Sequence, residues 1–438
     1  MTDPSNQASS PWSSPAMQAR LRGRRRAERL FRWAGLAAIA TAVAVLALLL
    51  GSIGVNGWSA FRQAELLLDV YFDPEKIEDV SGTSAETRHR ALSQTDFGAL
   101  VRDALRREFP EVKKRSDVRR LQALASSGAR PQLREMLLAD PRLRGKTVSV
   151  WVPADDEVDL LLKGEGSRDA PESDRRLSDA QIAWVDQLES DGRIRTVLNT
   201  RFLTSGDSRE PELAGIWGAV VGSFLTLVVT LAIVFPLGVS SAVYLEEFAP
   251  HNRWTDLIEV NINNLAAVPS IVFGLLGLAV FLNFMEMPRS APVVGGATLA
   301  LMTLPTVIIV ARAAIKAVPP SIREAARGLG ASPLQVVAHH VLPLAMPGVL
   351  TGTIISMARA LGETAPLLMI GMVAFIVDVP GGFTDAATAL PVQVFLWADS
   401  PERGFIEKTC GAILVLLAFL ISMNAVAIGL RQKLEKRW

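Results

Sequence analysis

The sequence predicts an all-α polytopic membrane protein with six transmembrane helices and a mixed α/β domain inserted after the first of them. Three observations support this fold class. Long runs of the chain carry no charge, charged residues concentrate in residues 55–212 between the first two runs, and arginines and lysines cluster beside the ends of the runs. About 20 apolar residues in a helix cross the hydrocarbon core of a bilayer, and a helix pairs all of its own backbone groups there.

Six stretches are long enough to be transmembrane helices. Five of them contain no charged residue, and the sixth, between His340 and Asp378, contains only Arg359 and Glu363. Helices in the core of a soluble protein seldom run this far without a charge, so we interpret all six as membrane spans. The five uncharged runs are residues 33–54, 213–245, 260–285, 290–311 and 409–430.

The first run, residues 33–54, is interpreted as a membrane anchor and not as a cleaved signal peptide. It is longer than a usual signal core, and a basic segment, residues 1–32, precedes it. Arginine and lysine mark the cytoplasmic ends of spans, so the N-terminus is expected in the cytoplasm. Six spans return the basic tail, residues 431–438, to the same side and leave residues 55–212 outside.

The segment of residues 55–212 is predicted to be a separate extracytoplasmic α/β domain. Apolar residues recur at helical spacing in three places, and two other places favour strands. A stretch rich in Gly, Ser, Asp and Pro, residues 164–179, is predicted to be a loop. The predicted helices are residues 91–109, 117–138 and 179–188, and the predicted strands are residues 147–152 and 158–166.

Composition excludes several classes of site. Cys410 is the sole cysteine, which rules out an internal disulfide and a cysteine-cluster metal site. The chain holds 45 Lys and Arg against 44 Asp and Glu, so it has no general electrostatic reason to bind nucleic acid. No metal-binding or catalytic constellation is recognised, and none is predicted.

The cytoplasmic segment of residues 317–345, between the fourth and fifth spans, is predicted to contain a short helix. Pro319 and Pro320 end the fourth span, and Ser321 with Glu324 three residues later has the pattern of a capping box. Pro333 is predicted to open the next turn or helix. A short helix in this position is suited to dock into the groove of a partner, although it could also be a mere connection.

The same segment resembles the EAA motif of permease subunits of bacterial ABC importers. The motif is carried by Glu324-Ala325-Ala326, Gly330 and Leu342-Pro343, while His340 stands where the family usually has isoleucine. The resemblance covers about residues 218–430. It implies a type I permease core of five helices in residues 213–430, whose EAA helix couples to a separate ATPase. It also implies that this chain is no enzyme and binds no cofactor, since the partner ATPase uses ATP-Mg.

The fifth span holds the candidate translocation residues. Arg359 and Glu363 are four residues apart, so they share a helix face and can pair. Charges inside a membrane are costly and usually face a pathway or a partner, and a guanidinium can bind a tetrahedral oxyanion through two donors. A structural ion pair that orients the spans is the alternative. Thr364 and, more weakly, Arg312 are further candidates, although Arg312 could be a snorkelling residue.

Two segments extend the resemblance to PstA-type permease subunits of phosphate importers: residues 263–274, from Asn263 to Gly274, and Arg359 to Pro366. This resemblance implies import of inorganic phosphate through the bacterial inner membrane. The implied partners are a second, PstC-like permease, an ATPase dimer and a periplasmic phosphate-binding protein. Residues 55–212 would then be periplasmic and could act as a scaffold for one of these partners.

Two other functions are open at this point. The same family includes permeases for other oxyanions, such as sulfate or molybdate. A transmembrane sensor that uses residues 55–212 is a different class, but a sensor usually needs a cytoplasmic output domain. The cytoplasmic segments expected here are short, which disfavours a sensor.

Overall fold

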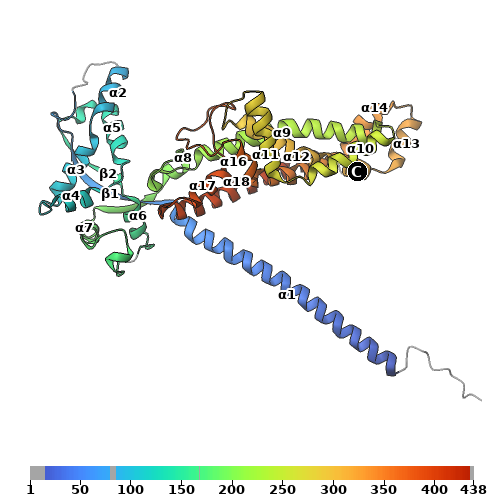
Figure 1. Cartoon of the computed structure of the whole chain (residues 1–438), viewed down its shortest axis with the longest axis horizontal. Coiled ribbons are helices and arrows are strands. Elements are labelled where there is room, and N and C mark those ends of the chain that lie inside the picture. Colours follow the sequence, from blue (N-terminus) through green and yellow to red (C-terminus); the bar gives the residue numbers. More distant parts are fainter. Residues whose placement is uncertain (1–14, 79–84, 167, 435–438) are drawn as a thin grey trace, which may run out of the picture. The chain divides into compact units, whose positions relative to one another are not determined.

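The computed structural model describes residues 15–78, 85–166 and 168–434 (Figure 1). The outer parts of the basic N-terminus and of the tail, residues 1–14 and 435–438, therefore lie outside the described residues. The chain divides into two compact units, Met1–Val55 and Asn56–Trp438.

The first unit consists of the greater part of helix α1 (Pro15–Ser59). The helix is continuous and starts well before the uncharged run, so it includes much of the predicted basic segment. Its residues from Ala19 to Ser59 are long and apolar enough to cross a membrane, with a mean hydropathy of 2.5. Large apolar side chains such as Trp33 and Leu48 are exposed in the structure. A helix that is apolar all round needs lipid or other helices around it.

The second unit begins with the domain predicted to be extracytoplasmic, called the outer domain below. It contains three strands and seven α-helices within the described residues. The strands are β1 (Arg62–Tyr71), β2 (Thr147–Pro153) and β3 (Ile194–Leu198). The helices are α2 (Ala85–Gln94), α3 (Phe97–Glu108), α4 (Arg115–Gln122), α5 (Ala129–Ala139), α6 (Asp156–Leu162), α7 (Asp179–Ser190) and α8 (Thr200–Thr204). Short 3₁₀ turns lie at Pro141–Leu143, Glu172–Asp174 and Pro211–Leu213.

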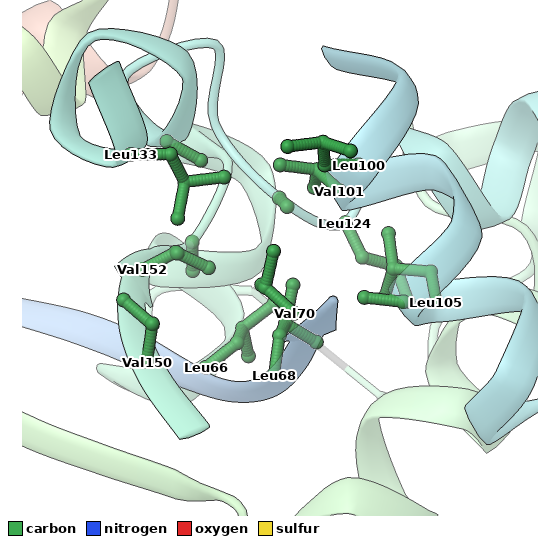
Figure 2. Packing of buried hydrophobic residues seen from close by; sticks show 14 of the residues in the cluster. Leu66, Leu68, Val70, Leu100, Val101, Leu105, Leu124, Leu133, Val150 and Val152 are labelled. Carbon is green, nitrogen blue, oxygen red and sulfur yellow. The ribbon is translucent and has the colours of Figure 1, made fainter. Parts of the chain in front are cut away.

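The strands form one antiparallel sheet in the order β2-β1-β3. Strand β1 lies in the centre, and every second residue from Ala64 to Val70 is buried, as expected for a strand with one face on a core. Leu66 is opposite Val152 of β2. Figure 2 shows this face of the sheet packed against α3, α5 and Leu124, which follows α4. The labelled side chains are Leu66, Leu68, Val70, Leu100, Val101, Leu105, Leu124, Leu133, Val150 and Val152.

The predictions for the outer domain are confirmed in part. The strand at residues 147–152 lies in β2, and the helix at residues 179–188 lies in α7. The predicted helix at residues 91–109 is interrupted between α2 and α3, because Asp96 caps α3 by accepting a hydrogen bond from the amide of Ala99, 3.1 Å away. The predicted helix at residues 117–138 is also two helices, α4 and α5.

One prediction for this domain was wrong, and two strands were missed. Residues 158–166 do not form a strand. They fall mostly in α6, where Asp155 caps the helix by accepting from the amide of Glu157. Strands β1 and β3 were not predicted at all, so the central strand of the sheet was missed.

The rest of the second unit follows the outer domain and is helical throughout its regular structure. Its α-helices are α9 (Trp217–Val243), α10 (Arg253–Ala266), α11 (Ser270–Gly277), α12 (Pro292–Lys316), α13 (Pro320–Gly328), α14 (Pro333–Val336), α15 (Leu342–Gly362), α16 (Ala365–Met369), α17 (Leu390–Ala398) and α18 (Gly404–Leu434). Three π-helical segments extend or join them: η5 (Tyr244–Phe248), η6 (Leu278–Phe284) and η7 (Val337–Val341).

Five helices in the described residues are long and apolar enough to cross a membrane, counting α1. The predicted third span, residues 260–285, is not one straight helix. It divides between α10 and the segment Ser270–Phe284, which are bent by 100° relative to each other. The prediction of six spans therefore holds only if this bent pair is counted as one span.

Helix α12 lies between α9 and α15 and packs closely on both. A Cβ atom on Gly296 of α12 would lie 2.7 Å from the carbonyl oxygen of Thr226 on α9, so only glycine allows this approach. The hydroxyl of Thr230 donates across the same contact to the carbonyl of Gly296, at 3.1 Å. A Cβ atom on Gly352 of α15 would likewise collide with Val310. Small residues at such crossings are typical of helix pairs in membranes.

Candidate functional site: a broken helix beside Arg359

The bend between α10 and α11 has a local cause in the sequence Ala267-Val268-Pro269. Pro269 lacks an amide hydrogen and disfavours a helical conformation for Val268 before it. The helix therefore ends at Ala266, where the amide of Ala267 donates back to the carbonyl of Asn264 at 3.1 Å. A new helix starts at Ser270, after Pro269, whose backbone is extended. This is the segment that resembles phosphate permeases in sequence.

A small cavity of about 20 Å³ opens at this break. Its wall brings together the end of α10, the first turn of α11, the middle of α12 and the last turns of α15. The lining residues are Leu265, Ala266, Val268, Ser270, Phe273, Met302, Thr303, Thr306, Ser356 and Arg359. One water molecule needs roughly 10–15 Å³, so the cavity as it stands is far too small for a tetrahedral oxyanion.

Four hydroxyl groups line this cavity, and the sequence alone did not single them out. Thr303 and Ser356 donate to carbonyl oxygens one turn earlier in their own helices, at 2.8 and 2.9 Å. Ser270 and Thr306 have no hydrogen-bond partner for their hydroxyl groups within the described residues, so both are available to donate to a ligand. The four hydroxyl residues could have been found only from the fold, since they lie on three separate helices, α11, α12 and α15.

Arg359 and Glu363 pair as predicted, but Glu363 lies one residue beyond the end of α15. Helix α15 ends at Gly362, and the backbone of Glu363 is extended. The Nε atom of Arg359 is 3.6 Å from Oε1 of Glu363, which is an ion pair but is too long for a good hydrogen bond. The side chain of Arg359 is 61% exposed against 21% for Glu363. The guanidinium therefore keeps donors free for another ligand.

The two other candidates for the path lie in different settings. Thr364 follows Glu363 and begins α16, where its carbonyl accepts from the amide of Leu368 at 3.0 Å. Arg312 is near the end of α12 and is not part of the wall of the cavity. Its guanidinium lies 2.6 Å from a carboxylate oxygen of Glu259 and 3.4 Å from one of Glu246. Arg312 is thus bound by protein carboxylates.

The coupling segment forms a short helix, α13, as predicted, but its cap differs from the prediction. The N-cap residue is Pro319, and no side chain caps the helix, so the capping box of Ser321 and Glu324 is wrong. Because Pro320 starts the helix, Ser321 is already inside it and cannot act as a cap. The capping box lies one helix later, where Ser332 and Gln335 cap α14 reciprocally.

The residues of the EAA pattern divide between an exposed and a buried face. Glu324 and Ala325 are exposed on α13, whereas Ala326 is buried against the core. Gly330 has a φ of +85°, a left-handed conformation that favours glycine. Leu342 and Pro343 are half-buried at the start of α15. Leu329 and Leu334 leave the segment with an exposed apolar surface.

Comparison with known proteins agrees with this architecture. A family described as "Binding-protein-dependent transport system inner membrane component" matches residues 234–438, and one described as "Domain of unknown function (DUF3333)" matches residues 18–172. The probable ABC transporter permease protein YqgI of Bacillus subtilis is 37% identical over 172 residues, which cover 39% of this chain and 58% of YqgI.

Two further relatives carry the name of a phosphate permease. "Phosphate transport system permease protein PstA 1" of Mycobacterium tuberculosis is 30% identical over 222 residues, which cover 51% of this chain and 72% of the relative. "Phosphate transport system permease protein PstA" of Mycobacterium leprae is 31% identical over 225 residues, with the same coverage of 51% and 72%. Among solved structures, the inward-facing MetNI methionine ABC transporter matches 51% of this chain at 16% identity, but its TM-score of 0.38 is too low to bear on the fold. The chain therefore belongs to the permease family of binding-protein-dependent ABC importers, and it is similar to PstA phosphate permeases over half of its length.

Proposed function

We propose that this chain is a permease subunit of an ATP-driven importer of inorganic phosphate, and that Arg359 and Glu363 lie on the translocation path. The observation that carries the proposal is the position of Arg359 at the hydroxyl-lined cavity of the broken helix. A guanidinium with free donors, together with hydroxyl groups, matches a tetrahedral oxyanion. The similarity to PstA proteins supports phosphate as the oxyanion.

Passage of phosphate requires this cavity to widen. The break between α10 and α11 provides the means, because a bend at Pro269 lets the two helices change their angle without breaking further hydrogen bonds. Arg359 would attract the anion, and Glu363 would limit how tightly the anion is held, since bound anion must also leave. Thr364 is a further candidate next to this pair. Alternation between an outward and an inward opening completes the cycle.

Permeases of this family work with an ATPase and a binding protein. We propose that the partners here are a PstC-like second permease, an ATPase dimer that uses ATP-Mg, and a periplasmic phosphate-binding protein. This chain itself would bind no cofactor and catalyse no reaction. The ATPase would contact the exposed residues Glu324, Ala325 and Gly330 of the coupling segment. In the inner membrane, both termini would be cytoplasmic and the outer domain periplasmic.

The test is uptake of radiolabelled phosphate by cells that depend on this chain and its partner subunits. Glu363→Gln should lower the initial rate about tenfold, which corresponds to about 1.4 kcal/mol in the barrier, while the ATPase still co-purifies with the chain. Asp399→Asn, at an exposed position after α17, is the matched control and should leave uptake unchanged. Normal uptake by Glu363→Gln at normal expression would remove Glu363 from the path.

Competition and co-purification separate the rival functions. Excess unlabelled phosphate should abolish the uptake, whereas sulfate and molybdate should not; inhibition by either would reassign the substrate. Purification in mild detergent should bring down an ATPase and a second permease. A kinase or regulator in their place would favour the sensor function.

A further inference from the structure

Arg323 occupies an unusual position on the coupling helix α13. It directly precedes the EAA residues, yet its guanidinium is turned inward, with 15% of the side chain exposed. It donates to the carbonyl oxygen of Ile315 in the last turn of α12, at 2.9 Å, and to that of Val318 just after this helix, at 2.6 Å. It also donates to Glu247 on η5, at 2.7 and 3.0 Å. One side chain thus joins three elements: α13, α12 and the end of α9.

Glu247 has a neighbour that makes a second connection of the same kind. Glu246, the preceding residue of η5, lies 3.4 Å from the guanidinium of Arg312 on α12. Arg312 in turn lies 2.6 Å from Glu259 on α10. The two adjacent glutamates therefore hold one arginine each, and the second arginine reaches the helix whose far end forms the break at the cavity of Arg359.

We propose that Arg323 and Arg312, with Glu246, Glu247 and Glu259, form a mechanical relay that carries motion of the coupling helix to the broken helix α10–α11. Hereafter these five residues are called the arginine relay. The proposal rests on the proposed function, because it presumes that a partner ATPase moves α13. It assigns Arg323 and Arg312 as positioning residues that act through α10, and it removes Arg312 from the translocation path.

The chemistry of the relay suits transmission of force. The guanidinium of arginine is planar and carries five donors in fixed directions, so it can bind carbonyl and carboxylate groups of different elements at once. The ammonium group of lysine does not fix the direction of its partners in this way. The side chain of Glu247 is only 6% exposed, and hydrogen bonds to a charged group in such a place are stronger than those at the surface. The π-helical geometry of η5 places Glu246 and Glu247 toward different arginines. Motion of α13 must therefore displace η5 and α12 with it.

The decisive measurement uses the purified complex with its partner subunits in lipid, and it compares the number of anions transported with the number of ATP molecules hydrolysed. Arg323→Met should lower this ratio about tenfold, since coupling between two sites typically amounts to 5–150-fold. The ATPase should still co-purify, because the exposed docking residues are unchanged. Lys316→Met, at an exposed position at the end of α12, is the matched control and should keep the full ratio.

Two further variants distinguish loss of the relay from misfolding of the chain. Arg323→Lys keeps the positive charge but loses the planar array of guanidinium donors, so it should give an intermediate ratio of anions transported to ATP hydrolysed. The exchange Glu247→Arg with Arg323→Glu should recover part of the ratio that each single change loses. If Arg323→Met keeps the parent ratio in a complex that is assembled and active, the relay is overturned.

A distance measurement tests the relay independently of which anion is transported. Cys410→Ser removes the natural thiol, and spin labels are then attached at Ile258→Cys on α10 and Leu334→Cys on α14, both exposed positions. The parent should show a narrow distance distribution that ATP leaves unchanged, because α10 and the coupling segment move together. Arg312→Met should broaden it. Absence of phosphate uptake, together with a narrow parent distribution that Arg312→Met broadens, would reject phosphate as substrate and keep the relay. An unchanged distribution in Arg312→Met would reject the relay alone.

Discussion

The two ends of the permease core are held by ionic clusters of different kinds. At the end next to the outer domain, Lys163, the C-cap residue of α6, lies 2.6 Å from Asp159 and 2.9 Å from Glu407 of α18. Lys408 lies 3.5 Å from Glu407. All four side chains are at most 5% exposed. At the end that holds the coupling segment, the side chains of the arginine relay are 6–35% exposed. The first cluster is thus fully withdrawn from water, and the relay only partly.

This difference indicates a fixed joint between the outer domain and α18 and a movable joint at the coupling segment. The carboxylate of Asp159 also accepts a hydrogen bond of 2.7 Å from the amide of Ala64 in β1, so the outer cluster ties α18 to the sheet of the outer domain. A buried charge that loses its partner is very costly, which opposes any separation of the two parts. The relay, in contrast, is partly accessible to water, so its five side chains can shift together as a unit without burying or exposing an unpaired charge. We expect the outer domain to move together with α18.

The largest expected effect is that of Lys163→Met, which tests whether buried charges fix the joint between the outer domain and α18. It leaves Asp159 and Glu407 buried with one less cation, and breaking a buried pair in this way costs about 3–5 kcal/mol. The outer domain should unfold at lower temperature in detergent and become sensitive to limited proteolysis. The fluorescence of Trp151 and Trp184 in that domain provides the readout.

Lys76→Met serves as the comparison for Lys163→Met. Lys76 pairs with Asp103 in the same domain, but the two side chains are 41% and 35% exposed. An exposed pair contributes only about 0–1 kcal/mol, so this variant should unfold close to the parent temperature. Equal losses in the two variants would show that the outer joint does not depend on its buried charges.

The dependence of stability on pH offers a second test of the outer domain, with a smaller expected effect. Burial raises the pKa of Glu212, just before α9, to about 7, although a hydrogen bond of 2.5 Å from the hydroxyl of Ser126 lowers it. Burial also raises the pKa of Asp155 to about 8, with further repulsion from Asp156 and Glu212. The folded state thus keeps protons that the unfolded chain releases above its ordinary carboxyl pKa. The stability contributed by these two carboxyls should be greatest in acid and should be lost as pH rises through 7 and 8.

Glu212→Gln should remove the part of this pH dependence that belongs to Glu212. Between about pH 5.5 and 8.5 that part amounts to about 2 kcal/mol. The part from Asp155 is reduced as well, because the repulsion from Glu212 is lost, but its burial and the repulsion from Asp156 remain. Ser126→Ala should act in the opposite direction, because it removes the hydrogen bond that favours the charged carboxylate. Thermal unfolding of the outer domain at several pH values measures both slopes. A Glu212→Gln variant with the parent slope would contradict this assignment.

Sequence patterns predicted the membrane part far better than the outer domain. Uncharged runs located the long helices because lipid allows few other structures. The central strand β1 was missed although Ala64, Leu66, Leu68 and Val70 alternate correctly, because Leu67 fills one intervening position and makes the run look continuous. Strand β3 is short and half-exposed, so its pattern is weak. The apolar pattern of residues 158–166 indicated a strand, but the N-cap residue Asp155 favours a helix there.

The candidate site shows a different limit of prediction. Arg359 and Glu363 could be recognised because charges inside an apolar run are conspicuous. Ser270, Thr306 and Ser356 could not, because hydroxyl groups are common in membrane helices and only the fold brings these together. The bend at Pro269 was predictable from its chemistry, yet the length of the uncharged run concealed it. The partners of Arg312 lie 53 and 66 positions away in the chain, beyond any local pattern.

The smallest effect that we predict concerns two glycines of the coupling segment. It tests whether the movable joint at this segment depends on a single turn, the one at Gly330. Gly330 has a φ of +85° with open space around it, so Gly330→Ala meets only backbone strain, on the order of 1 kcal/mol. Gly328 lies in α13, also with open space, and Gly328→Ala should be neutral or stabilising there. The first variant should lower the affinity of the detergent-purified chain for its ATPase up to about fivefold, and the second should not. Equal affinities would mean that the left-handed turn at Gly330 is not required for docking, whereas a loss in both would place the contact on the surface of α13 itself.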